Sequence, residues 1–277
     1  LEIEVHFQKS PELGRRYIYS TSGQDATWLL KGSPTKANQV VDMAIKLLGE
    51  EVHNTFILSS TRGGVSRVHG TGSSPSWVGK VGQFLVPLLA IIFGKREHEH
   101  IAKQINEWAP YFGITAISAG YWGEQRLGSD YRDPVLETVL GLAGSSGGTR
   151  QVLCVITQLF WAPIRSIIII EEPEISLHPE SQLHLIDLFA EVIKDEKQIL
   201  ITTHSPILVM ALSQAVQKGK LKSDDVAVYH VEKKEKTGTV TKPLPVNSKG
   251  HVKGWIPSFA KVERKLLREW AKSLPQV

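Results

Sequence analysis

Four consecutive isoleucines, Ile167–Ile170, run directly into Glu171 and Glu172 in the stretch IIIIEEPEISLHPE. A strand with one face in water alternates apolar and polar residues. A run without alternation therefore predicts a strand buried on both faces, central in a parallel sheet covered by helices. Ligands of such sheets bind beyond the carboxyl ends of the strands. The run thus predicts an α/β fold that holds two carboxylates at its ligand edge.

The sequence around this strand alternates between helix and strand patterns, which is typical of βαβ units. At the N-terminus, alternating residues predict an antiparallel hairpin that turns at SPELG. Near the C-terminus, DVAVYHVEKKEKTGTVTKPLPV predicts a second strand pair, followed by a basic amphipathic helix at 259–274. The other expected elements are helices at 36–49, 80–93, 97–109, 149–160, 180–194 and 206–218, strands at 55–60, 166–170 and 198–202, and a polar loop at 61–76.

The composition is that of an ordinary globular chain, with 42% hydrophobic and 22% charged residues. The single cysteine, Cys154, has no partner in the chain, which favours a reducing, cytoplasmic setting. The longest apolar runs are shorter than the roughly 18 residues that cross a bilayer, so we expect no membrane span. The net charge of +4 is spread over 32 basic and 28 acidic residues, which permits contact with nucleic acid but does not indicate it.

The paired carboxylates suggest a metal site. Two carboxylates held close together repel each other unless a cation or a proton relieves them. A Mg²⁺ ligand beside a general base satisfies this requirement, because the metal neutralises one carboxylate and leaves the other to orient water. Glu171 and Glu172 fit that arrangement; the alternative is a pair of solvated glutamates at a strand end.

Two neighbouring segments add features that suit phosphate. GSSGGTRQ, residues 144–151, precedes an apolar helix; its glycines let backbone N–H groups approach an anion, and a helix N-terminus carries positive potential. A flexible loop that caps a helix is the alternative. QILITTHSP, residues 198–206, ends a strand in Thr-Thr-His, so we expect His204 at the same sheet edge as the two glutamates.

In this order and spacing, the segments resemble the ABC-type ATPases, the family that includes SMC-like repair proteins. SSGGTRQ is similar to the signature motif LSGGQxQ, IIIIEEP to the Walker B strand, EISLHPE to the D-loop and ITTHSP to the switch-histidine loop. The segments EEPEISLHPE and THSP most resemble those of the soluble OLD-like, AAA-type and SMC-like ATPases of archaea and bacteria. The resemblance implies the C-terminal portion of a P-loop NTPase head, with a mainly parallel sheet flanked by helices and an antiparallel β-hairpin.

The resemblance also implies roles for individual residues, with ATP and Mg²⁺ as cofactors. Glu171 would hold Mg²⁺ through water, Glu172 would be the base for the attacking water, and His204 would sense the γ-phosphate. Heads of this family sandwich two nucleotides between them, so a second ATPase head, in a homodimer, is an expected partner. The signature residues would contact the γ-phosphate held by the opposite head; they are Ser146, Gly147, Gly148 and Gln151.

The sequence departs from the family pattern in three places. Glu171 stands where the metal position is usually Asp, and Ser145 and Thr149 replace the Leu and Gln of the signature. No G-x-x-x-x-G-K-[ST] motif is present: the nearest segment, SSPSWVGKVG, lacks the first glycine and the hydroxyl residue. The chain begins at Leu1 rather than at a methionine, so we expect a C-terminal fragment that lacks an upstream Walker A segment and binds ATP poorly by itself.

We therefore expect residues 1–133 to form the hairpin and helical part of an ATPase head, and residues 134–277 to carry the signature, Walker B and switch histidine. DNA, in repair or defence, is an expected partner. The alternative function is a non-catalytic module with a degenerate ATPase fold that binds nucleic acid or protein. Glu172 and His204 favour catalysis, since a degenerate head has no need of either.

Four other features have plainer interpretations. The two histidines of REHEHIAK, two residues apart, favour a solvated charged face over a metal pair. Asp224 and Asp225 favour a turn over a nuclease site. The basic C-terminal helix favours packing on the core over binding to nucleic acid. Arg62 and Arg67, in the polar loop, could act electrostatically near a phosphate.

Overall fold

The computed structural model describes residues 2–7, 10–22, 25–30, 54–64, 69–70, 74–121, 126–235, 238–254, 265–270 and 272. The chain divides into two compact units, Leu1–His53 and Asn54–Val277. The sequence analysis expects a division at residue 133, which is based on the motifs that each part carries and not on compactness. That division stays a prediction. The helix expected at 36–49 lies outside the described residues.

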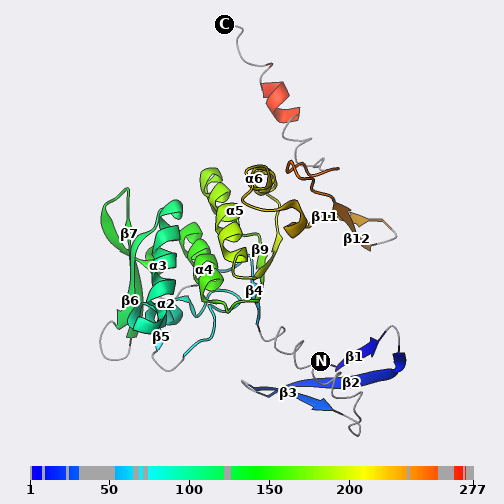
Figure 1. The fold of residues 1–277 in the computed structure, drawn as a ribbon. Helices are drawn as coiled ribbons and strands as arrows, with labels where there is room; N and C mark the ends of the chain where they lie inside the picture. The colour runs from blue at the N-terminus through cyan, green and yellow to red at the C-terminus, as the bar shows by residue number, and fades with distance from the viewer. Residues whose placement is uncertain are drawn as a thin grey trace. The chain divides into compact units, whose positions relative to one another are not determined.

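The first unit contains a three-stranded antiparallel sheet in the order β1-β2-β3 (Figure 1). Its first two strands form the predicted hairpin. The reversal comes before Ser10, so the SPELG segment, expected to be the turn, is the start of the second strand. The strands are β1 (Glu2–Phe7), β2 (Ser10–Ser22) and β3 (Asp25–Leu30).

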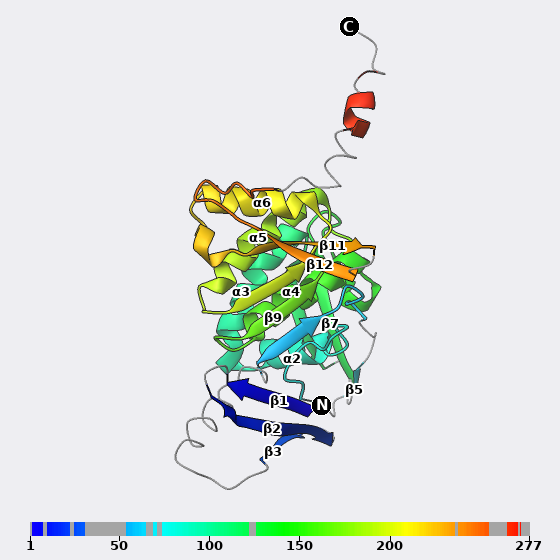
Figure 2. The same ribbon diagram turned by 90° about the vertical axis from the view of Figure 1, so that its right-hand side faces the viewer.

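The second unit is built around a parallel sheet in the order β10-β9-β4 (Figure 2). The strands are β4 (Thr55–Leu58), β9 (Ile167–Glu171) and β10 (Gln198–Thr202). The isoleucine strand β9 lies between the other two and pairs with each in parallel, as its sequence predicts. All three carboxyl ends therefore lie at one edge of the sheet.

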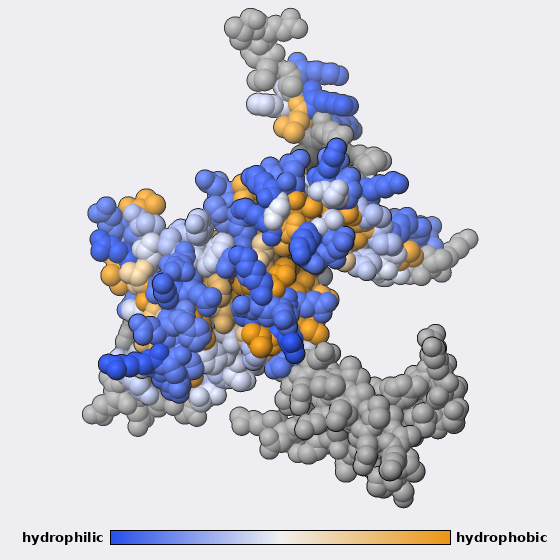
Figure 3. Space-filling view, in the orientation of Figure 1, coloured by the Kyte–Doolittle hydropathy of each residue, from blue (hydrophilic) through white to orange (hydrophobic). Residues whose placement is uncertain are grey.

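Burial of β9 differs between its two faces. Ile168 and Ile170 are fully buried on the side of the helices. On the other face Ile169 is only half-buried, and its strand neighbours Ile57 and Leu200 are 41% and 46% exposed. The prediction of burial on both faces is thus correct for one face only, because the described helices α4 and α5 cover a single side. Figure 3 shows hydrophobic surface where Figure 1 draws β4 and β9.

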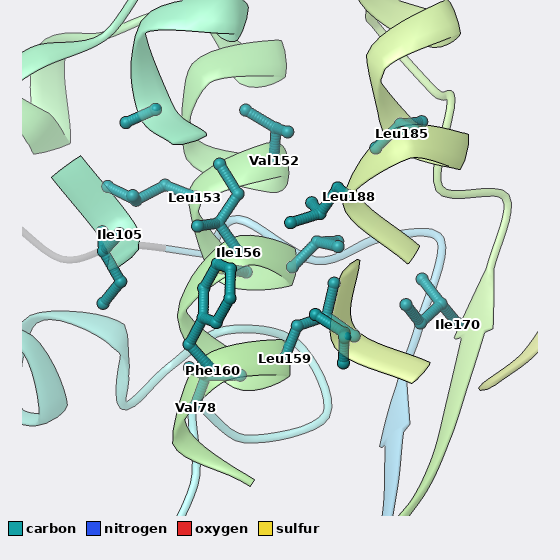
Figure 4. Packing of buried hydrophobic residues seen from close by; sticks show 14 of the residues in the cluster. Val78, Ile105, Val152, Leu153, Ile156, Leu159, Phe160, Ile170, Leu185 and Leu188 are labelled. Atoms are coloured by element: carbon teal, nitrogen blue, oxygen red, sulfur yellow. The ribbon is translucent and has the colours of Figure 1, made fainter. Parts of the chain in front are cut away.

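The core helix is α4 (Gly147–Trp161), in which every residue from Val152 to Phe160 is buried. It packs beside α5 (Pro179–Ile193), and buried side chains of both helices belong to the same hydrophobic core as Ile170 of the sheet (Figure 4). The predicted helix and strand positions from residue 149 to 218 are thereby confirmed. The remaining helices are α2 (Leu85–Gly94), α3 (Glu99–Trp108) and α6 (Pro206–Gln217), with short 3-10 helices at Arg96–His98, Ala109–Phe112, Leu142–Gly144 and Ser223–Asp225.

An antiparallel sheet absent from the sequence prediction packs against α2. Its order is β5-β7-β6, with β8 also paired to β7; the strands are β5 (His69–Gly70), β6 (Thr115–Tyr121), β7 (Arg126–Asp133) and β8 (Thr138–Gly141). The predicted C-terminal strand pair is present as β11 (Val228–Lys234) and β12 (Gly238–Leu244). Residues 265–270 of the expected basic helix are helical, and the described residues include no helix long and apolar enough to span a membrane.

Candidate functional site

The two candidate carboxylates lie where β9 ends. Glu171 is the last residue of the strand and pairs with Thr202, the last residue of β10. The backbone N–H of Glu172 donates to the carbonyl oxygen of Thr202 at 2.9 Å. Glu172 has a φ of 45°, in the left-handed region that few residues other than glycine adopt. The chain thus turns sharply at this residue, at the sheet edge where ligands of parallel sheets bind.

The histidine loop is tied to the acidic loop by Glu174. Its Oε1 accepts hydrogen bonds from the hydroxyl of Thr203 at 2.6 Å and from the backbone N–H of His204 at 3.1 Å. Its Oε2 is buried and has no hydrogen-bond partner among the described residues. The side chain of His204 is exposed at the same edge as Glu171 and Glu172, as expected from its position after β10.

The end of β4 supplies two groups that the sequence analysis missed. The hydroxyl of Ser59 donates to Oε2 of Glu171 at 3.3 Å, and the backbone N–H of Ser60 donates to the same oxygen at 3.2 Å. The position of both serines after an apolar strand was the available signal, because that strand joins the same sheet. These contacts hold the Glu171 carboxylate at the mouth of the sheet.

Arg62 follows the serines and is almost completely buried, with 2% exposure. Its guanidinium donates to the carbonyl oxygens of Glu171 at 2.6 Å and Glu172 at 3.0 Å. Burial lowers the pKa of Arg62, while the nearby carboxylates of Glu174, Glu172 and Glu171 act in the opposite direction. The sequence analysis places Arg62 in a loop where it could act on a phosphate. In the structure its guanidinium is instead directed at the backbone of Glu171 and Glu172.

The signature-like segment forms the N-terminus of α4. Ser146 is the N-cap residue, and its hydroxyl oxygen accepts from the backbone N–H of Thr149 at 3.1 Å. Ser146 and Gly147 are exposed, whereas Gly148 is buried beneath the backbone of Ser176 in the loop after β9. An exposed serine and glycine at a helix N-terminus are suited to an anion.

The remaining signature residue, Gln151, links this helix to the loop after β4. Its backbone carbonyl accepts from Nε of Arg62 at 3.4 Å, and its side-chain Oε1 is buried without a partner among the described residues. Its neighbour Arg150 donates from Nε to the carbonyl oxygen of Gly63 at 3.0 Å. The signature helix and the carboxylate edge are therefore joined through residues 59–64.

The donor set suits Mg²⁺ bound together with a nucleotide. Mg²⁺ prefers oxygen ligands, and in phosphate sites one or two carboxylates suffice because water and substrate complete the shell. Glu171 and the Ser59 hydroxyl supply such oxygens in contact with each other. Within the described residues, no group of three or more histidine, cysteine or acidic side chains could hold a metal by itself. These oxygens would therefore supply only some of the ligands of a Mg²⁺ ion, and the rest would come from water and nucleotide.

Two of the other candidates lie elsewhere. His98 pairs with Glu97 and packs its ring against Trp161, with only 20% of its side chain exposed, so the interpretation of a solvated face fits the exposed His100 but not His98. Asp224 and Asp225 lie in a short 3-10 helix before β11, as the turn interpretation predicts. Arg67 is outside the described residues.

Comparison with known proteins bears on this arrangement. Residues 95–209 match the family model described as AAA ATPase domain. That segment contains α4, β9 and β10, and with them Ser146, Glu171, Glu172 and His204. A search of curated proteins returned no match.

Several solved structures are similar to this chain at low identity. One, from work on ATP-driven dimerization and DNA-stimulated activation of SMC ATPases, is 15% identical, with 65% of this chain and 96% of that chain covered, at a TM-score of 0.41. The SMC head domain from Thermotoga maritima is 12% identical, with 88% and 73% covered and a TM-score of 0.38. The Pyrococcus furiosus SMC head bound to a ScpA domain is 15% identical; this chain covers 39% of it, at a TM-score of 0.40. Residues 95–209, which are less than half of the chain, are thus similar to the AAA ATPase domain family.

Proposed function

We propose that this chain carries one half of a Mg·ATP hydrolysis site, and that a segment outside these 277 residues supplies the phosphate-cradling loop. The observation that carries the proposal is the position of three candidate residues at one sheet edge. Glu171 ends β9, Glu172 follows it, and His204 follows the neighbouring parallel strand β10. The sequence has no G-x-x-x-x-G-K-[ST] motif, and for this reason the proposal assigns the phosphate-cradling loop to another segment.

Glu171 is the residue suited to the metal. Its carboxylate is already fixed by the Ser59 hydroxyl and the Ser60 N–H, so it needs little reorganisation to accept a cation. When bound, Mg²⁺ would neutralise charge on the phosphate oxygens. Glu171 has one methylene more than the aspartate usual at this position, and the contacts from the end of β4 hold that longer side chain in place.

Glu172 is the candidate general base. Its backbone is held by Thr202 on one side and by Arg62 on the other, which fixes where the side chain leaves the chain. A base acts on water only from within hydrogen-bond reach, so a fixed backbone is an advantage. His204 completes this edge, with its own backbone tied to Glu174.

The exposed N-terminus of α4 supports a second head as partner. Ser146 and Gly147 present a hydroxyl and an uncovered backbone to the outside of this chain, at the positive end of a long helix. They would contact a nucleotide held by another copy. DNA as a further partner rests on the resemblance alone, and the turnover assay below, repeated with duplex DNA, tests whether DNA stimulates the activity.

The test is Glu172→Gln in the complete polypeptide that contains this chain together with a P-loop. Glutamine keeps the size of the side chain but cannot take a proton from water, so ATP turnover should fall by about 10²- to 10⁴-fold while ATP-dependent dimers accumulate. Glu107→Gln, at an exposed position in α3 outside the motifs of the candidate site, is the matched control and should retain turnover. Undiminished turnover in Glu172→Gln would remove Glu172 from the role of base.

A further inference from the structure

Arg62 is the largest of the fully buried side chains among the residues described. Burying a guanidinium is costly unless its N–H groups are satisfied, and an apolar side chain would fill the same space without that cost. Its presence therefore calls for a reason beyond packing.

Main-chain carbonyl oxygens are the partners that the structure gives this guanidinium. Nη1 donates to Ser59 at 3.1 Å and to Glu171 at 2.6 Å, and Nη2 donates to Glu172 at 3.0 Å. Nε donates to Gln151 at 3.4 Å. These carbonyls come from three separate segments: the loop after β4, the end of β9 and the first turns of α4. One planar group thus fixes the spacing between all three.

The carbonyl of Glu172 is held in an unusual backbone conformation. Its φ of 45° is strained for a residue with a side chain, so surrounding contacts must maintain it. The oxygen accepts from Arg62 and also from the backbone N–H of Ile175 at 3.1 Å, while the N–H of Glu172 donates to Thr202. Arg62 is the only one of these partners that reaches Glu172 from the loop after β4.

The charge of Arg62 has a second effect. Glu171, Glu172 and Glu174 lie near enough for their charges to stabilise the buried cation, and the attraction is mutual. A fixed positive charge behind the carboxylates reduces their repulsion before any metal arrives. Lysine could supply the charge but not the flat fork that reaches several carbonyls at once.

We propose that Arg62 is a positioning residue of the ATPase site, which holds the backbone of Glu171 and Glu172 at a fixed place relative to α4. The role rests on the proposed function, because it has meaning only if Glu172 acts on a water molecule. Arg62 itself touches no substrate. By holding the backbone of the turn, it sets the direction in which the Glu172 side chain points.

The first test uses this chain alone and does not depend on hydrolysis. In Arg62→Lys, the backbone amides of Glu172 and Ile175 should exchange with deuterium about tenfold faster, while amides in the middle of α4 keep their wild-type rates. Arg165→Lys is the matched control, since Arg165 is an exposed arginine paired with Glu196. Unchanged exchange at Glu172 and Ile175, or an equal increase throughout α4 and β9, would overturn the proposal.

The second test measures turnover in the complete polypeptide. Because small displacements of a catalytic group are costly, Arg62→Lys should lower kcat by about 10²-fold and leave KM for ATP unchanged. A residue that only stabilises the fold would lower the active fraction on heating without this effect on kcat at low temperature. A wild-type kcat in Arg62→Lys contradicts the role. Lack of turnover in the wild type instead refutes the proposed function, and the exchange result then stands as a statement about the backbone alone.

Discussion

Replacing Gly148 with alanine tests the contact between the signature-like helix and the loop after β9. A Cβ built on Gly148 would overlap the carbonyl oxygen of Ser176 and lie 3.2 Å from its carbonyl carbon, with a side-chain carbon of Leu177 at 3.7 Å. The obstacle is backbone, so it cannot move aside as the end of a flexible side chain would. Ser176 also has a φ of 62°, which leaves its loop little freedom to shift.

The expected magnitude follows from two opposing terms. Overpacking of this kind costs about 1–3 kcal/mol, whereas replacing glycine by alanine within a helix gains up to about 1 kcal/mol. Subtracting the gain from the cost leaves about 0–3 kcal/mol, and the expected net loss is at the centre of that range, about 1–2 kcal/mol. For a folded unit of this size the melting temperature should fall by about 2–8 °C.

The assay is thermal and urea denaturation of the 277-residue chain, followed by circular dichroism. Gly147→Ala is the matched control, because a Cβ on Gly147 meets nothing within 4 Å, so that variant should be as stable as wild type or slightly more so. Equal stability of Gly148→Ala and Gly147→Ala would refute the packing argument. The pair also separates two roles: Gly147→Ala should weaken ATP-dependent dimerisation without a loss of stability.

Two further predictions concern buried groups. In Glu174→Ala, the Thr203 hydroxyl and the His204 N–H lose their acceptor, so the free energy of unfolding should fall by about 1–3 kcal/mol. The His204 amide should also exchange faster with deuterium. An unchanged exchange rate of this amide would argue against the tie between the two loops. Burial raises the pKa of the Cys154 thiol to about 12 from 9.0. The native protein should therefore resist thiol reagents at pH 8 and react once per chain after denaturation. Between pH 9 and about 12 the unfolded chain releases this proton while the folded chain keeps it, so wild-type stability should fall relative to Cys154→Ala as pH rises; parallel pH curves would contradict this.

Much of the α/β core could be predicted because its signals are local. The isoleucine run of β9 and the apolar residues of α4 identify their elements without knowledge of the rest of the chain, and the place of His204 after β10 follows from strand order. The antiparallel sheet of β6 and β7 was missed. Its strands contain short polar segments such as SAG and GSD, and the pairing of β6 is interrupted after Thr115, where Ala116 adopts a φ of 47°. The residues of these strands lack a pattern that identifies a strand by itself, and the sheet is apparent only from the pairing between strands.

The supporting contacts of the candidate site lay beyond sequence reasoning for a different reason. Ser59 and Arg62 act on residues more than a hundred positions away, and Glu174 acts on a loop that begins 29 residues later. Motif spacing gives the order of such residues but not which side chain turns inward. The sequence identifies Arg62 as a loop arginine, but only the folded chain shows that its guanidinium faces backbone carbonyls.

The choice of carbonyl oxygens as the partners of Arg62 has a consequence for how this site can diverge. Every residue type has a carbonyl, so the arginine does not depend on which side chains occupy positions 59, 151, 171 and 172. Its hydrogen bond to the carbonyl of residue 171 would therefore be the same with glutamate or aspartate at that position. The side chains at this sheet edge can therefore change while Arg62 keeps the backbone arrangement that carries them.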